Sequence, residues 1–229
     1  MKRRHVFPVL AVVASLLVGT TTTVGAQVDD PDPARFAEAF GDFSSWDTKN
    51  SVPEDAILFV GSSSIRFWNT AERFPHRRVI NRGFGGAHIS DVNHFVKEAV
   101  LQYGLDVIVF YAGDNDIAAG KTGDQILEDY QEFVHAVLSE NPATDVIFVA
   151  IKPSLARWSL WPRMQVANDL IRSYSAERAN LHYADVAPPM LGADGMPRPE
   201  LFVGDGLHMT SAGYDVWTRV LNQALARIH

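Results

Sequence analysis

The sequence contains no cysteine in its 229 residues. This absence excludes disulfide bonds, thiolate metal sites, a cysteine nucleophile and a lipid-modified N-terminal cysteine. Stability must therefore come from a hydrophobic core, which a chain of this length is large enough to form. Hydrophobic residues make up 47% of the sequence and charged residues 21%, which is typical of a single globular domain.

An excess of basic residues is also lacking, because 20 Lys and Arg stand against 27 Asp and Glu. The net charge of −7 repels phosphate backbones and anionic membranes. Beyond the first few residues, Lys and Arg form no cluster on any single segment. The sequence therefore predicts no nucleic-acid partner, and it carries no signal for an oligomeric state.

No apolar run reaches the roughly 20 residues of a membrane anchor. The apolar run 6–18 follows the basic residues Lys2, Arg3 and Arg4, and it ends before a Thr tract and the small residues 24–26. This layout predicts a signal peptide over 1–26, cleaved after Ala26, and export to a periplasm or to the outside. Cleavage removes three basic residues and no acidic ones, so the net charge falls from −7 to −10.

After the signal peptide we expect a polar lead segment over 27–53, with a short helix over 34–40, and then one domain over 54–229. In that domain, short β-branched runs alternate with longer segments of helical period. This alternation predicts an α/β fold with a parallel sheet and crossover helices. The expected strands are 56–60, 78–81, 106–111, 145–151 and 181–183.

Helical periodicity places apolar residues on one face of 92–103 and on one face of 126–137. Thr122 and Gln125 have the spacing of a capping box at the start of the second helix, and Pro142 follows its end. Two further helices are expected over 164–177 and 210–228.

Residues that follow strands are the candidates for chemistry, since open parallel sheets bind ligands at the carboxyl ends of their strands. Gly61 leads from the first strand into Ser62, Ser63 and Ser64 at an expected helix start, where a serine is exposed near the positive end of a helix. The alternative is that these serines only cap the helix.

Two further strand ends carry polar or glycine-rich segments. The segment 82–87 holds Gly83, Gly85 and Gly86, which let backbone N–H groups approach a ligand, although such glycines can simply form a turn. The segment 112–116 holds Asn115 between two aspartates, which can hydrogen-bond a ligand or form an Asx-type turn, while a metal site is less favoured because the cluster supplies few oxygen ligands.

Before the last expected helix, Asp205 and His208 lie three residues apart, so the acid can hold one ring nitrogen while the other faces a serine. Together, a serine, an Asp–His pair, a glycine-rich segment and an asparagine satisfy the roles that acyl transfer requires.

In this order, the four segments resemble the conserved blocks of the SGNH hydrolases, also called GDSL esterases or lipases. The resemblance implies a flavodoxin-like three-layer α/β/α fold with a central five-stranded parallel sheet. It implies Ser63 as nucleophile, Asp205 and His208 as its triad partners, and an oxyanion hole formed by Ser63, Gly86 and Asn115. The chain is most similar to the small platelet-activating-factor acetylhydrolase-like branch. Ser62 and Ala87 stand where the family usually has Asp.

These features predict a serine esterase that cleaves small or acetyl esters, including carbohydrate esters, with no cofactor and no metal. Trp68 and the segment 154–162, which contains Trp158 and Trp161, are expected to form either an aromatic rim for substrate or part of the core.

Two alternatives remain open at this point. One is a catalytically silent, exported carbohydrate-binding protein on the same fold. The other is a metal-dependent phosphoesterase that uses the region of Asp114 and Asp116.

Overall fold

A computed structural model describes residue 1 and residues 28–228 of the chain. The predicted signal peptide falls almost entirely on residues outside this range. The elements, in chain order, are η1 Pro33–Phe36, α1 Ala37–Asp47, β1 Ile57–Gly61, α2 Ser63–Arg66, α3 Thr70–Arg73, β2 Val79–Gly83, α4 Ile89–His94, α5 Val96–Ala99, η2 Leu101–Tyr103, β3 Val107–Tyr111, α6 Asp114–Ala119, α7 Gly123–Glu140, β4 Asp145–Val149, η3 Trp158–Leu160, α8 Trp161–Ala176, β5 Leu181–Ala184, α9 Ala187–Met190, η4 Pro199–Leu201 and α10 Ser211–Leu225.

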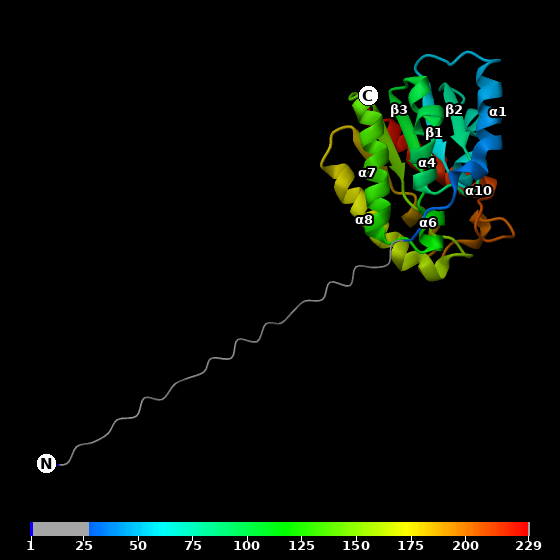
Figure 1. Cartoon of the computed structure of the whole chain (residues 1–229). Coiled ribbons are helices and arrows are strands. Elements are labelled where there is room, and N and C mark those ends of the chain that lie inside the picture. Colours follow the sequence, from blue (N-terminus) through cyan, green and yellow to red (C-terminus); the bar gives the residue numbers. More distant parts are fainter. Residues whose placement is uncertain (2–27, 229) are drawn as a thin grey trace.

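The five strands form one sheet in the order β2-β1-β3-β4-β5, and every neighbouring pair is parallel. Because all strands point the same way, the loops that follow them gather at one edge of the sheet, the lower edge in Figure 1. The predicted α/β/α architecture with a five-stranded parallel sheet is confirmed. Among residues 28–228, no helix is long and apolar enough to cross a membrane.

Alternate strand residues face opposite layers, as the two-residue period of a strand requires. Leu58 and Phe110 belong to one core cluster, while Phe59 and Val109 belong to the other. The first cluster lies under α1, α4, α7 and α8, and the second under α2, α9 and α10. The central strands β1 and β3 are buried along their whole length, which explains their unbroken apolar sequences.

Most expected elements lie within a few residues of their observed bounds, and three differences have a clear physical reason. The strand expected over 145–151 ends at Val149, and the backbone then turns so that Asn168 hydrogen-bonds both the N–H and the C=O of Ile151. The helix expected over 92–103 is divided into α4, α5 and η2. The break between α4 and α5 falls at Phe95. The backbone of Phe95 leaves helical geometry, and its ring stacks on Phe40 at 3.9 Å between ring centroids.

The third difference concerns the lead segment, where the helix runs from Ala37 to Asp47 and so extends beyond the expected 34–40. It lies beside the edge strand β2 (Figure 1). Phe36 at its start is buried in the first core cluster and packs edge-on against Phe84 at 4.8 Å. Asp30 also pairs with Lys121 at 2.5 Å. The segment therefore packs onto the body of the protein, because a few aromatic residues in a mostly polar stretch suffice to anchor it.

Candidate active site

The turn after β1 is shaped by Gly61. Its φ is +135°, and a Cβ there would lie 1.9 Å from the carbonyl oxygen of Tyr111, so a larger side chain does not fit. The Ser62 N–H donates to that same oxygen at 2.9 Å, and the Phe84 N–H donates to Gly61 O at 2.9 Å. These bonds join the ends of β1, β2 and β3 and place Ser63 as the first residue of α2.

Only one of the three consecutive serines is accessible. Ser62 and Ser64 are buried, with 2% and 4% of their surface exposed, whereas Ser63 is half-buried. The Ser63 Oγ lies 3.0 Å from Nε2 of His208. Of the three, Ser63 is therefore the serine that the tertiary structure pairs with an imidazole.

His208 is held by Asp205 in the loop before α10. Nδ1 of His208 lies 2.6 Å from Oδ2 of Asp205, while Oδ1 accepts the N–H groups of Leu207 and His208 at 2.8 and 2.9 Å. The hydrogen bond to His208, and then the two backbone bonds, lower the pKa of Asp205 to about 2. An ionised carboxylate thus keeps Nδ1 protonated and leaves Nε2 free to accept a proton from Ser63.

The predicted oxyanion groups are the backbone N–H groups of Ser63 and Gly86 and the side chain of Asn115. Within residues 28–228, the backbone N–H groups of Ser63 and Gly86 have no hydrogen-bond partner. Gly86 has a φ of +82° and is exposed. The Asn115 side chain reaches the same loop, because its Nδ2 donates to Ala87 O at 3.0 Å. The structure thus brings Asn115 against the loop that carries Gly86.

The two aspartates that flank Asn115 are buried and paired with cations. Asp114 contacts Lys152 at 3.2 Å and also pairs with Arg157. Asp116 accepts the Ile89 N–H at 3.1 Å and lies 3.7 Å from Lys121. Burial raises the pKa of Asp116 to about 7, against the lowering influence of Lys121, and burial lowers the pKa of Lys152 to about 7.

The ion pairs occupy both carboxylate oxygens of Asp114 and Oδ1 of Asp116, which are atoms that a metal would need. In the described part of the chain, no group of three or more His, Cys, Asp or Glu residues is arranged to hold a metal ion. The geometry of this region therefore favours a structural role for Asp114 and Asp116.

The aromatic residues expected either at a substrate rim or in the core include Trp68 and Trp161, and both are buried. Trp68 is 2% exposed and packs in the second core cluster, and Trp161 is buried with Trp158 stacked on it at 6.1 Å between ring centroids. The exposed aromatic at the site is instead Phe67, which sits edge-on to the His208 ring at 5.1 Å. Its position just before the buried Trp68 is the one sequence signal that could have indicated it.

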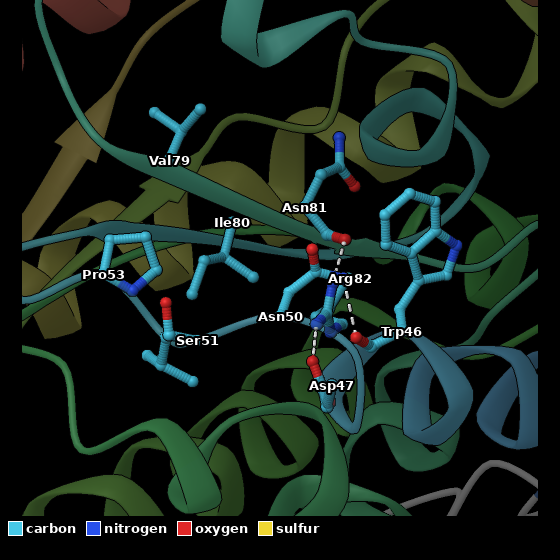
Figure 2. A pocket seen from close by; sticks show the side chains of 10 residues that line it. Trp46, Asp47, Asn50, Ser51, Pro53, Val79, Ile80, Asn81 and Arg82 are labelled. Carbon is cyan, nitrogen blue, oxygen red and sulfur yellow. Dashed lines mark hydrogen bonds and ion pairs between the residues drawn. The ribbon is translucent and has the colours of Figure 1, made fainter.

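A hollow elsewhere on the molecule lies between the end of α1, the following loop and the edge strand β2 (Figure 2). It is lined by Trp46, Asn50 and Arg82 among others, and none of the triad residues reaches it. The Arg82 guanidinium there pairs with Asp47, whose carboxylate also accepts the Tyr103 hydroxyl at 2.7 Å. The charged groups of this hollow are thus already engaged with one another.

The sequence profile of the GDSL-like Lipase/Acylhydrolase family matches residues 63–216, which is more than half of the chain. The chain belongs to this family. The matched range contains Ser63, Gly86, Asn115, Asp205 and His208. A comparison with curated proteins finds no match.

Several solved structures share the fold of this chain. A candidate platelet activating factor from Streptococcus pneumonia superposes with a TM-score of 0.75 at 19% identity, covering 84% of this chain and 92% of that one. A GDSL-like lipase from Bacteroides thetaiotaomicron gives 0.71 at 20% identity, covering 83% and 98%. A carbohydrate esterase family 3 protein from Talaromyces cellulolyticus gives 0.60 at 17% identity, covering 76% and 97%. At these identities the likeness concerns the fold.

Proposed function

We propose that this member of the GDSL family is a serine ester hydrolase that works through an acyl-enzyme on Ser63. The observation that carries the proposal is the continuous chain of contacts from Ser63 Oγ to His208 at 3.0 Å and from His208 to Asp205 at 2.6 Å. Serine, imidazole and ionised carboxylate in this order are the groups that acyl transfer needs.

In the proposed reaction, Nε2 of His208 takes the proton of Ser63 as Oγ attacks the ester carbonyl. The protonated imidazole, stabilised by Asp205, then returns this proton to the leaving alcohol. The backbone N–H groups of Ser63 and Gly86 and the Asn115 amide would hold the negative oxygen of the tetrahedral intermediate. Water, activated by the same imidazole, then releases the acid and restores Ser63.

We further propose that the substrates are small or acetyl esters, with a carbohydrate as the natural alcohol. Exposed Phe67 beside His208 offers a flat apolar surface of the kind that sugar rings pack against. The fold shared with a carbohydrate esterase family 3 protein agrees with this choice. The layout of residues 1–26 leads us to infer that the enzyme acts after export.

The test compares hydrolysis of p-nitrophenyl acetate, butyrate and octanoate by residues 27–229 and by the Ser63→Ala variant. We expect activity to be highest on acetate and to be lost in the variant. Ser62→Ala, which alters the neighbouring buried serine, is the control and should keep the activity. Full activity in Ser63→Ala would contradict the proposal.

A silent carbohydrate-binding protein on the same fold is the second candidate, favoured by the same exposed Phe67. Labelling with a serine-reactive organophosphate separates the two candidates, since an activated serine reacts and a silent one does not. The expected result is a single phosphorylated site at Ser63, detected by mass spectrometry. An unlabelled, folded protein would favour the binding function.

A further inference from the structure

Arg157 reaches from the loop after β4 to the end of β3. Its Nη2 donates to Oδ1 of Asn115 at 3.1 Å, and its Nη1 pairs with Asp114. Only 20% of the side-chain surface is exposed. The guanidinium is therefore held in place by two neighbouring residues, one of which belongs to the proposed oxyanion hole.

The contact decides which way the Asn115 amide faces. A guanidinium can only donate hydrogen bonds, so it requires the oxygen of the amide and excludes the nitrogen. The Nδ2 group is thereby turned to the other side, where it donates to Ala87 O at 3.0 Å. An NH₂ group has two hydrogens, so the second one is left for a ligand beside the loop of Gly86.

The same segment is also attached to the loop that carries the proposed base. The Ala156 N–H donates to Gly206 O at 3.0 Å, between Asp205 and His208 in the sequence. The residues 155–157 thus link the two halves of the site, the imidazole side and the oxyanion side. This gives the segment after β4 a role that its sequence does not reveal.

From this geometry we propose that Arg157 is a positioning residue, which orients the Asn115 amide so that an Nδ2 hydrogen faces the oxyanion. The inference rests on the function proposed above. Arg157 touches no reacting atom in this scheme, and it acts through Asn115 alone. Loss of Arg157 leaves the Lys152 amine 3.2 Å from Asp114, so the buried carboxylate keeps one hydrogen-bond donor.

The experiment is a double-mutant cycle with kcat and KM measured on p-nitrophenyl acetate for wild type, Arg157→Leu, Asn115→Ala and the double variant. Removal of an oxyanion donor typically costs about 10²-fold in kcat, and we expect this of Asn115→Ala. We expect Arg157→Leu to lower kcat about tenfold with KM within about twofold. The double variant should be no slower than Asn115→Ala, because residues that act as one unit are not additive.

Two controls keep the test decisive. Arg172→Leu removes an arginine that pairs with two aspartates at the surface, and it should leave kcat unchanged. Arg157→Lys keeps a positive charge beside Asp114 but lacks the fork that reaches both partners, so its kcat should lie between wild type and Arg157→Leu. If Arg157→Leu does not fold, Arg157→Lys replaces it in the double-mutant cycle.

The inference is overturned if the leucine variant keeps full kcat, or if it lowers kcat by the same factor with and without Asn115. It also fails if Asn115→Ala has wild-type activity, since Arg157 would then have nothing to position. Failure of the proposed function is a different result, namely activity that survives in Ser63→Ala.

Discussion

Two carboxylates, Asp205 and Asp116, have opposite environments. Asp205 lies on an exposed loop, where hydrogen bonds from His208 and two backbone N–H groups lower its pKa to about 2. Asp116 is fully buried at the end of β3, where loss of solvent raises its pKa to about 7. The comparison teaches that hydrogen-bond donors set the charge of the loop carboxylate, whereas burial dominates at the strand end.

The difference also separates a carboxylate that serves the proposed reaction from carboxylates that stabilise the fold. On the loop, the carboxylate can serve His208 with little consequence for the fold, because its surroundings are solvent. At the strand end, the aspartates hold backbone and cations inside the protein, so changes there alter stability first. Three measurements test this division, from the largest expected effect to the smallest.

Replacing Asp205 with Asn should give the largest effect, a loss of about 10⁴-fold in kcat, because an amide cannot stabilise the protonated imidazole. The free energy of unfolding at pH 7 should change by less than about 1 kcal/mol, as for most substitutions at exposed sites. Ester hydrolysis and urea unfolding of the same preparation check both numbers. A large fall in stability with unchanged kcat would show instead that Asp205 has a structural role.

The second prediction concerns Asp116 and pH. Its pKa in the folded state, about 7, lies above the ordinary value of 3.8, so the folded state binds the extra proton between these values. The stability that this proton brings is present below pH 4 and is lost as the pH rises towards 7. From pH 5 to pH 8, wild type should lose about 2–3 kcal/mol relative to Asp116→Asn.

Urea unfolding at the two pH values measures this difference. Asp205→Asn is the matched control, because Asp205 has a lowered pKa and its contribution is lost only as the pH falls from about 4 towards 2. It should therefore leave the change between pH 5 and pH 8 as in wild type. Equal pH dependence in Asp116→Asn and wild type would show that burial does not govern Asp116.

The smallest effect is expected within the loop itself. Gly206 has a φ of +66°, and a Cβ there would lie 3.1 Å from Leu155 Cβ and 3.3 Å from Ala156 N. Gly206→Ala should therefore cost about 1 kcal/mol of stability. Gly204→Ala in the same loop meets no atom within 4 Å and should be neutral. Thermal unfolding of the two variants makes the comparison, and equal midpoints would refute it.

Much of the fold could be predicted because its signals are local. The apolar runs at β1 and β3 and the capping box of Thr122 and Gln125 all appear in the structure close to their expected bounds. The length of α1 could not be predicted, since its stability comes from Phe36 and Phe40 packing on Phe84 and Phe95, far along the chain. Boundaries that depend on tertiary contacts leave little trace in local sequence.

The candidate site divides in the same way. Its serine, glycine, asparagine and Asp–His residues could be located because each lies in a recognisable block, either after a strand or before the last helix. Sequence spacing could not show which of three adjacent serines is accessible, because burial depends on the residues that pack against each one. Arg157 was missed for a related reason, as its partners Asp114 and Asn115 lie 43 and 42 residues away.

By itself, the sequence determined the strand and helix pattern, the family and the chemical types available at the sheet edge, since these follow from periodicity and short motifs. Only the tertiary structure decided that Ser63 faces His208, that Phe67 and not Trp68 is exposed beside it, and that Arg157 contacts Asn115. The physical reason is that accessibility and hydrogen-bond partners are properties of packing, which brings together residues that the chain keeps far apart.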